Sequence, residues 1–149
     1  MGAPHYTPSG NPVQGSLGEP KEIRDEFILI ESGIQVMNDL PMNLWFEDAN
    51  VDTPRFIVVP WASVIERVYV VNSVDNTVTA TVFTLEIAGV PVVLDAALSL
   101  GATASAGTVL SANATSANVV AAGGSVEVIS DNGGSAVMPC TVTLAMRRT

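Results

Sequence analysis

The chain has 149 residues and a formal net charge of −9, and 48% of its residues are hydrophobic although only 5% are aromatic. A chain of this length can form one domain with a substantial hydrophobic core, built here mainly from small branched residues. Neither Lys nor Arg occurs between Val68 and Met146. Because phosphate contacts need clustered basic side chains, we expect no nucleic-acid partner, and no acidic membrane partner for the same reason.

The N-terminus lacks a basic segment followed by an apolar one, so the sequence predicts no signal peptide. No stretch of the sequence is long and apolar enough to span a bilayer. The single cysteine, Cys140, has no partner for an internal disulfide, which is typical of a reducing compartment. We therefore expect the chain to fold in a cytoplasm.

Residues 1–18 are rich in Pro, Gly and Ser and have almost no apolar periodicity, which predicts a flexible N-terminal arm. One interpretation is a disordered tail, and the other is an arm that becomes ordered on a partner. Tyr6 and the prolines suit the second interpretation, so Tyr6 is a candidate contact residue.

Residues 19–40 are predicted to form one short α-helix. Pro20 suits the first turn, and Glu19 and Glu22 suit the positive end of the helix dipole. Apolar residues recur in this segment at alternating spacings of four and three and form a heptad-like seam: Ile23, Phe27, Ile30, Ile34 and Met37. The seam would pack either on the chain's own β-domain or on symmetry mates or a partner. Two heptads are too short to hold a coiled coil alone, so packing on other protein surface is favoured.

Residues 41–54 are predicted to form a linker with an apolar kernel, Leu44-Trp45-Phe46, and an acidic rim of Glu47, Asp48 and Asp52. Carboxylates this close together invite a calcium-site hypothesis. A calcium-binding loop needs ligands at defined spacings and a glycine at its turn, and the segment has neither. We interpret it as a solvated acidic loop and expect no metal and no cofactor.

The β-domain is predicted to span residues 55–149. Its centre is residues 55–89, where two runs rich in Val, Ile, Thr and Phe flank a polar turn at Asp75-Asn76 and predict a strand–turn–strand hairpin. In the second run the apolar phase changes between Val82 and Phe83. This change predicts a β-bulge at that point, or a strand that is buried on both faces.

The rest of the β-domain consists of short predicted strands. Pro91 predicts an edge strand at residues 90–94, because proline cannot donate to a sheet ladder. Val126 and Val128 are expected to face one way along their strand. Further strands are predicted at residues 98–104, 107–112, 124–130 and 135–148, with a loop at 113–124 and a turn at 131–134. The predicted fold is mainly β, an antiparallel β-sandwich or jelly-roll-like domain preceded by the arm and the helix.

The sequence predicts no catalytic machinery. His5 is the only histidine and lies in the predicted arm, so it would not be held beside a nucleophile. Cys140 is predicted to be a small buried hydrophobe. Isolated carboxylates on predicted strands are Glu66, Glu86 and Glu127, and a glycosidase would need two of them facing each other in a cleft. We expect no enzymatic activity and no small-molecule substrate.

Three segments of the β-domain are distinctive: Pro60-Trp61-Ala62, residues 118–123, and the Asp131-Asn132-Gly133-Gly134 turn. With these segments, residues 60–148 resemble small β-sandwich proteins of tailed bacteriophages that are associated with capsid decoration, also called cement or head-stabilising proteins. Residues 23–41 are similar to a short helix, ending in Leu-Pro, of several phage structural proteins. Ala88-Gly89 and Gly124 depart from the pattern, because relatives commonly have Asn-Gly and Asp there.

The resemblance implies a structural virion protein that binds the outer surface of a phage capsid and stabilises it, with the major capsid protein as its partner. It also points to a homotrimer, because icosahedral lattices offer threefold positions, and the helical seam is an independent indication of self-association. Such a protein is made in the host bacterial cytoplasm and ends on the outer capsid surface. The candidate capsid-contact or oligomer-interface residues are Tyr6, Ile23, Phe27, Ile30, Ile34 and Met37.

A second function remains open from the sequence. The chain could be a phage fibre or tail module that binds a receptor or a carbohydrate. Exposed Trp or Tyr side chains on one face of the domain would favour that function. The sequence offers only Trp45, Trp61, Tyr6 and Tyr69 for this purpose.

Overall fold

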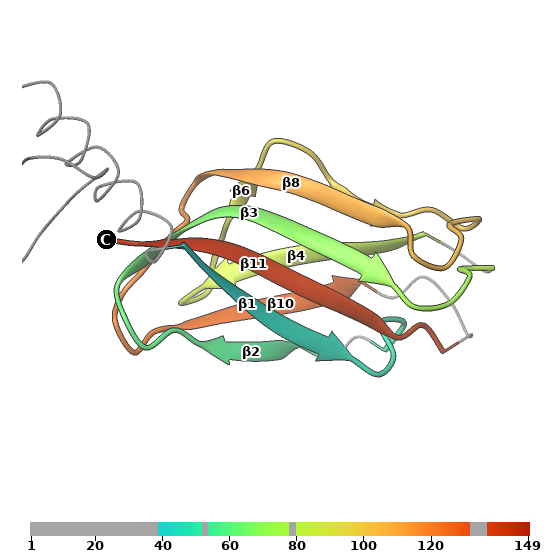
Figure 1. The fold of residues 1–149 in the computed structure, drawn as a ribbon, viewed down its shortest axis with the longest axis horizontal. Helices are drawn as coiled ribbons and strands as arrows, with labels where there is room; N and C mark the ends of the chain where they lie inside the picture. Colours follow the sequence, from blue (N-terminus) through green and yellow to red (C-terminus); the bar gives the residue numbers. More distant parts are fainter. Residues whose placement is uncertain (1–38, 52–53, 78–79, 132–136) are drawn as a thin grey trace, which may run out of the picture. The chain divides into compact units, whose positions relative to one another are not determined.

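The computed structural model describes residues 39–51, 54–77, 80–131 and 137–149 (Figure 1). The chain divides into two units after Asn38, and all of the described residues belong to the second unit, Asp39–Thr149. The predicted arm at 1–18 lies outside the described residues. The same holds for the predicted helix at 19–40, except for its last two positions.

The described residues form eleven strands in two antiparallel sheets. The six-stranded sheet has the order β1 (Asp39–Phe46), β11 (Cys140–Arg148), β3 (Ser63–Asn72), β8 (Val109–Ser116) and β6 (Val93–Leu94), and β9 (Val119–Val120) also pairs with β3. The five-stranded sheet has the order β2 (Arg55–Val58), β10 (Ser125–Asp131), β4 (Thr81–Ile87) and β5 (Val90–Pro91), and β7 (Leu98–Leu100) also pairs with β4. The prediction of a mainly β, antiparallel fold is therefore confirmed.

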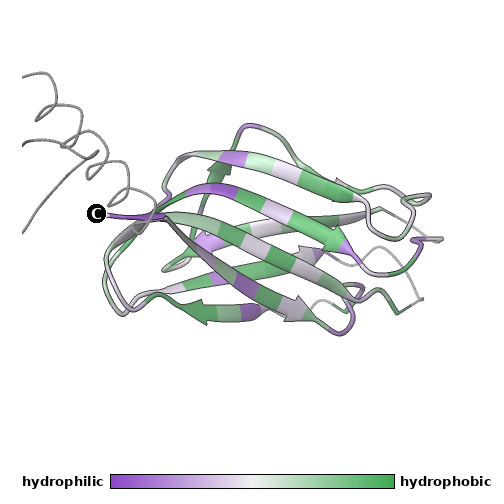
Figure 2. Ribbon diagram, viewed as in Figure 1, coloured by the Kyte–Doolittle hydropathy of each residue, from purple (hydrophilic) through white to green (hydrophobic). Residues whose placement is uncertain are grey.

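The hydrophobic core is built from alternate residues of the strands. Along β11 the even-numbered residues Cys140, Val142, Leu144 and Met146 are buried. Figure 2 shows this alternation of hydropathy along the strands. From the five-stranded sheet, Phe83 packs its ring edge-on against Phe46 of β1, with the ring centroids 6.0 Å apart. The inner faces of both sheets thus share one core cluster, which gives a β-sandwich-like architecture.

The domain begins earlier than predicted, because the first part of the predicted linker at 41–54 is strand β1. This strand pairs with β11 along its whole length, from Asp39↔Arg147 to Phe46↔Cys140. The predicted helix at 19–40 also ends too late, since Asp39 already belongs to β1. The strand tolerates Pro41 because it lies at the edge of its sheet. Phe46 enters the core and Leu44 packs against it, while Trp45 stays outside, so only Trp45 of the Leu44-Trp45-Phe46 kernel lies on the surface.

The predicted hairpin in residues 55–89 is wrong, because β3 and β4 lie in different sheets. The polar residues between them bind another loop. The side chain of Asp75 accepts a hydrogen bond from the N–H of Ala106 at 2.7 Å. The amide of Asn76 donates to the carbonyl of Gly101 at 3.0 Å. These contacts tie the connection to the loop before β8 and let the chain cross from one sheet to the other.

The bulge predicted between Val82 and Phe83 is wrong, and so is the alternative of a strand buried on both faces, because Thr84 is exposed. The register between β4 and β10 runs without a shift from Ile87↔Val126 to Val82↔Asp131. The register between β3 and β11 does shift, because Ala145 pairs with Arg67 and Met146 pairs with Ile65. Glu66 is the extra residue of this β-bulge. Glu66 and Arg67 are consequently both exposed, and the buried positions of β3 change phase there.

The predictions for the remaining strands are partly confirmed. Pro91 lies in an edge strand, β5, as predicted, but Val93–Leu94 leaves it and forms an edge of the other sheet. Strand β10 matches the prediction, with Val126 and Val128 both buried. The predicted loop at 113–124 is wrong, because β8 continues to Ser116 and β9 follows. The closing strand is β11, and the rest of the predicted turn at 131–134 after Asp131 lies outside the described residues.

Candidate interaction surfaces

The predicted contact and interface residues all precede the described domain. They are Tyr6, Ile23, Phe27, Ile30, Ile34 and Met37, and they lie outside the described residues. Their roles therefore stay predictions, and the surfaces below are those of the β-domain alone.

The ionisable side chains of the described residues form no reactive cluster. Burial, with a smaller contribution from the carboxylate of Asp48, raises the pKa of the Cys140 thiol to about 12, so this cysteine is a buried thiol as predicted. Within residues 39–51, 54–77, 80–131 and 137–149, no group of three or more His, Cys, Asp and Glu residues could hold a metal ion. The same part of the chain has no helix long and apolar enough to cross a membrane.

Asp48, one member of the predicted acidic rim, has a structural role. Its Oδ1 accepts hydrogen bonds from the N–H groups of Asn50 at 2.9 Å and Met138 at 3.0 Å. These bonds join the segment after β1 to the segment before β11. The carboxylate therefore closes a loop, which differs from the solvated role that the sequence predicted.

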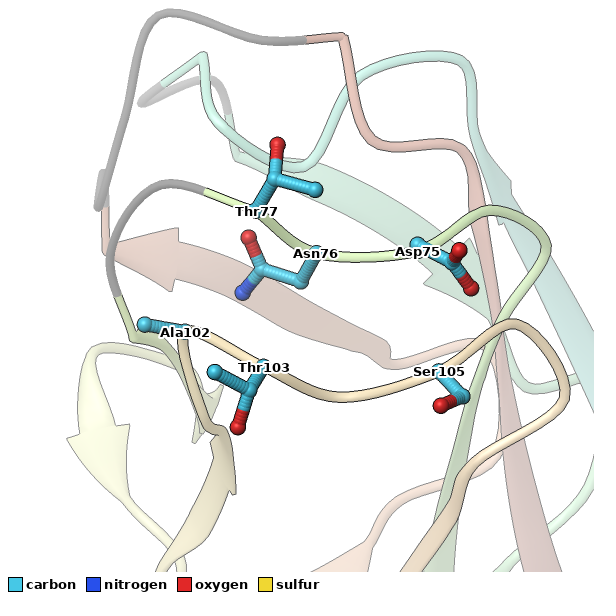
Figure 3. Close-up of a pocket in the computed structure, with 6 residues that line it drawn as sticks. All are labelled: Asp75, Asn76, Thr77, Ala102, Thr103 and Ser105. Carbon is cyan, nitrogen blue, oxygen red and sulfur yellow. The ribbon is translucent and has the colours of Figure 1, made fainter.

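A shallow cavity of about 330 Å³ lies between the connection from β3 to β4 and the connection from β7 to β8 (Figure 3). Its lining is polar and small: Asp75, Asn76, Thr77, Ala102, Thr103 and Ser105. Asp75, the single carboxylate in this lining, is held by the N–H of Ala106. The cavity therefore joins two loops and presents no pair of groups for acid–base chemistry.

The outer side of the six-stranded sheet carries an uncharged surface that we call the aromatic face. Its residues lie in two rows across four strands: Trp45, Thr141, Val71 and Val109 in one row, and Asn43, Thr143, Tyr69 and Ser111 in the next. The Trp45 side chain is 52% exposed although Phe46 beside it is buried. The Thr143 hydroxyl donates to Asn43 Oδ1 at 2.8 Å, so the polar members of this face are partly fixed.

A polar network lies on the same sheet beside the aromatic face. Arg67 Nε donates to Asn113 Oδ1 at 2.7 Å, and Asn113 Nδ2 donates to Asp95 Oδ2 at 2.6 Å. The guanidinium of Arg67 also lies 5.9 Å from the centroid of the Tyr69 ring. The hydrogen bonds from the side chain and then the backbone of Asn113 lower the pKa of the Asp95 carboxyl. Asn113 therefore bridges the Arg67 guanidinium and the Asp95 carboxylate through hydrogen bonds.

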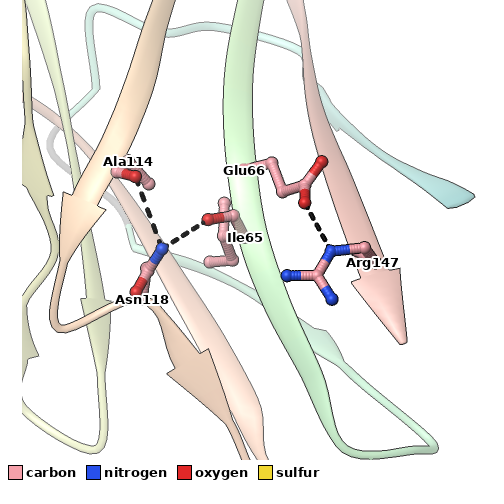
Figure 4. A network of polar contacts seen from close by, with 5 residues as sticks. All are labelled: Ile65, Glu66, Ala114, Asn118 and Arg147. Carbon is pink, nitrogen blue, oxygen red and sulfur yellow. Dashed lines mark hydrogen bonds and ion pairs between the residues drawn. The ribbon is translucent and has the colours of Figure 1, made fainter. Parts of the chain in front are cut away.

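The second polar network of this sheet surrounds the bulge of β3 (Figure 4). Arg147 Nε binds Glu66 Oε1 at 2.6 Å. On the other side of β3, Asn118 Nδ2 donates to the carbonyls of Ile65 at 2.8 Å and Ala114 at 3.4 Å. The N–H of Ile65 donates in turn to the Asn118 carbonyl at 2.9 Å. Asn118 therefore fills the gap between β8 and β9, and its role in this network is structural.

The outer side of the five-stranded sheet carries a different surface, which we call the acidic face. Its residues are Phe56, Val58, Glu86, Glu127, Ile129 and Asp131. The register places Phe56, Glu127 and Glu86 side by side across β2, β10 and β4. Phe56 is 58% exposed and Val58 is 63% exposed. Large apolar side chains and carboxylates therefore share one side of the sheet.

The charges of the acidic face are not balanced within the described domain. Glu86 and Glu127 are direct cross-strand partners, and like charges in that position destabilise a sheet. The cation nearest in sequence, Arg55 of β2, lies on the inward side, where its Nε is buried without a hydrogen-bond partner. The other described arginines, Arg67, Arg147 and Arg148, belong to strands of the six-stranded sheet.

No protein-family model matches this sequence, and no curated protein matches it.

In the sequence, Glu86 and Glu127 are isolated carboxylates on separate predicted strands. Their pairing depends on the β4–β10 register, which joins segments about forty residues apart and leaves no local signal. A local signal did exist at β2, where Phe56 and Val58 alternate with Arg55 and Ile57. That alternation indicates that one side of the strand consists of Phe and Val, whichever way it faces.

Proposed function

We propose that this chain is a structural virion protein that binds the outer surface of a tailed-bacteriophage capsid and stabilises it, as a decoration or cement protein. The resemblance of residues 60–148 to such proteins motivates the proposal. The observation that carries it is the acidic face, where exposed apolar side chains lie beside carboxylates that no described cation neutralises. Such a surface is complementary to a basic, partly apolar patch on another protein.

The partner in this proposal is the major capsid protein, and the chain acts without enzymatic activity, cofactor or small-molecule substrate. The β-domain, with a jelly-roll-like topology, is the rigid part. Residues 1–38 supply a further capsid contact through Tyr6 and the predicted helix. The protein is made in the host cytoplasm and resides on the outer surface of the virion.

A binding experiment tests this function. Capsids assembled without the chain are mixed with the purified full-length protein and sedimented, and the bound fraction is measured by gel densitometry. The proposal predicts saturable binding and a higher temperature of capsid disruption when the protein is bound. Absence of binding to empty and to filled capsids, or binding to isolated tails alone, would overturn it.

Self-association as a homotrimer is a separate part of the proposal. The seam of Ile23, Phe27, Ile30, Ile34 and Met37 would meet its copies around a threefold axis. A charge in the seam should separate the subunits, so Phe27→Asp is expected to convert a trimeric mass to a monomeric mass in light scattering. A monomeric mass for the unmodified protein would contradict a trimer held by this chain.

The second candidate function is a phage fibre or tail module that binds a receptor or a carbohydrate. The aromatic face favours it, because Trp45 is half exposed beside hydroxyl and amide side chains, a combination that stacks on and hydrogen-bonds to sugars. Binding of the full chain to host cell envelopes, lost in Trp45→Ala and kept in Phe56→Ala, would support this candidate over capsid binding.

A further inference from the structure

We propose that the acidic face docks a single Arg or Lys side chain of a partner protein between Glu86 and Glu127, while Phe56 and Val58 hold apolar residues that flank that cation. The inference rests on the proposed function, since the capsid surface is the partner that would present this basic segment. It specifies which sheet faces the partner and what chemistry the partner must supply.

The geometry of the carboxylate pair suits one shared cation. Glu86 and Glu127 are direct partners on neighbouring strands, and side chains in such pairs begin about 5 Å apart. Both side chains point away from the core, because Leu85 and Val126 beside them are buried. A guanidinium presents a planar fork of N–H donors, so it can bind both carboxylates at once.

The pair has no compensating interaction inside the domain. Neither glutamate makes an ion pair or a side-chain hydrogen bond to any residue between Asp39 and Thr149 that the structure describes. Repulsion between the two therefore lowers the stability of the unbound domain. A cation from a partner would remove this repulsion and would be attracted to both carboxylates. Both effects favour the bound state.

The apolar part of the acidic face lies directly beside the pair. Phe56 is the cross-strand neighbour of Glu127, and Val58 follows it on the same side of β2. Sheet edges are commonly protected by charged side chains, whereas this edge strand turns a phenyl ring and an isopropyl group to the outside. Aromatic residues, including Phe, and Arg are enriched at protein interfaces.

A second copy of this domain is a poorer occupant than a different protein, because its described arginines are either engaged or turned inward. Arg67 is bound to Asn113, and Arg147 is bound to Glu66. The guanidinium of Arg148 lies 5.7 Å from the centroid of the Trp61 ring, and Arg55 is turned inward. A basic segment of another protein can bind without breaking these contacts.

The first experiment measures binding to capsids assembled without the chain. Glu86→Gln with Glu127→Gln in the full-length protein should weaken binding at least about tenfold at low salt, and Phe56→Ala should weaken it independently of salt. The matched control is Glu47→Gln with Glu66→Gln, which changes the net charge equally. Glu47 directly follows β1 and Glu66 lies in β3, and both strands belong to the six-stranded sheet. The control should bind within about threefold of the unmodified protein.

The second experiment does not need a capsid. A synthetic peptide of alternating arginine and leucine is titrated into the isotope-labelled full-length chain, and amide NMR shifts are followed. The expected result is saturable shifts in β2, β4 and β10 that disappear in the Glu86→Gln, Glu127→Gln variant. Shifts confined to Glu47, Asp48 or Asp75, or shifts unchanged in the variant, would overturn the inference.

The two experiments separate failure of the inference from failure of the proposed function. If capsids bind the unmodified protein and the Glu86→Gln, Glu127→Gln variant equally, the inference is wrong and the function stands. If capsids bind no form but the peptide shifts the acidic face as described, the function is wrong and a cation-docking face remains. Thermal unfolding of each variant confirms that the fold is retained, since both substitutions are isosteric and on the surface.

Discussion

The outer faces of the two sheets use their charged residues in different ways. On the six-stranded sheet, Arg67 is bound through Asn113 to Asp95, and Arg147 is bound to Glu66. On the five-stranded sheet, Glu86 and Glu127 oppose each other directly, and their neighbour Phe56 is exposed. The first arrangement satisfies its charges internally and stabilises the domain. The second leaves both charge and apolar area available to a partner, which is why we assign docking to it.

The largest expected effect is on binding, from reversing the charge of the acidic face. Glu86→Lys with Glu127→Lys should reduce the affinity for undecorated capsids at least about a hundredfold, because like charges would then face the basic partner. Glu47→Lys with Glu66→Lys, which changes the net charge by the same amount outside this face, should reduce it far less. Sedimentation at low and high salt measures both variants, and equal losses would show that only net charge matters.

The next effect is on stability, on the opposite sheet. Asn113→Ala removes the side chain that joins Arg67 to Asp95, and we expect the free energy of unfolding to fall by about 1–2 kcal/mol. Urea unfolding followed by circular dichroism measures this difference. Glu127→Ala, on the acidic face, should cost less than about 0.5 kcal/mol, because that side chain has no partner to lose. A neutral Asn113→Ala would show that the network does not stabilise the domain.

Each sheet also contains one alanine in the left-handed region, which offers a matched pair of turn variants. Ala88 has φ 53° in the two-residue turn from β4 to β5, and Ala117 has φ 52° before Asn118. Asn adopts this conformation more readily than Ala, so Ala88→Asn should raise the free energy of unfolding by about 0.5–1 kcal/mol. Ala117→Asn should give a similar gain. Differential scanning calorimetry measures both, and a destabilised Ala88→Asn would contradict the assigned turn.

A smaller stabilisation should follow from removing the repulsion on the acidic face. Glu127→Gln is expected to raise the free energy of unfolding by about 0.2–0.5 kcal/mol at neutral pH and low salt. The gain should shrink as salt screens the two partly exposed charges. Glu66→Gln, which breaks the ion pair with Arg147, should change stability in the opposite direction. Loss of stability in Glu127→Gln would mean that the two carboxylates do not repel each other.

The smallest expected effect is a loss of stability at acidic pH. Because Asn113 holds the pKa of Asp95 below its ordinary value, Asp95 contributes stability above the unfolded-state pKa of about 4 and loses it as pH falls through the folded-state pKa. The difference in melting temperature between the unmodified chain and Asp95→Asn should therefore be constant near neutral pH and shrink in acid. A difference that is the same at all pH values would exclude this contribution.

Local patterns in the sequence predicted individual strands well. Strand β10 was predicted because Val126 and Val128 alternate with polar residues, and this signal lies within one segment. The edge position of Pro91 followed from its missing N–H. Strand β1 was missed because Pro41 and the nearby carboxylates are typical of a linker, while its pairing with β11 depends on residues about a hundred positions away.

Relations between strands could not be predicted in the same way. The runs that became β3 and β4 indicated two strands but not their partners, and the chain sends them to different sheets. The bulge at Glu66 has a local signal, because Glu66 and Arg67 interrupt the apolar alternation of β3. The sequence does not show which partner strand keeps its phase there. The pairing of Glu86 with Glu127 depends on the register between β4 and β10, which neither segment specifies alone. The candidate residues of the arm and helix, from Tyr6 to Met37, remain predictions from their spacing alone.

Cryo-electron microscopy of capsids decorated with the full-length protein tests the central claim most directly. The account predicts ordered density for the two-sheet domain on the outer lattice, with the five-stranded sheet toward the shell and a basic capsid side chain between Glu86 and Glu127. The six-stranded sheet, with Trp45, should then face the solvent. Density restricted to the tail would contradict the proposed function, and a domain bound with the acidic face toward the solvent would contradict the assigned docking surface.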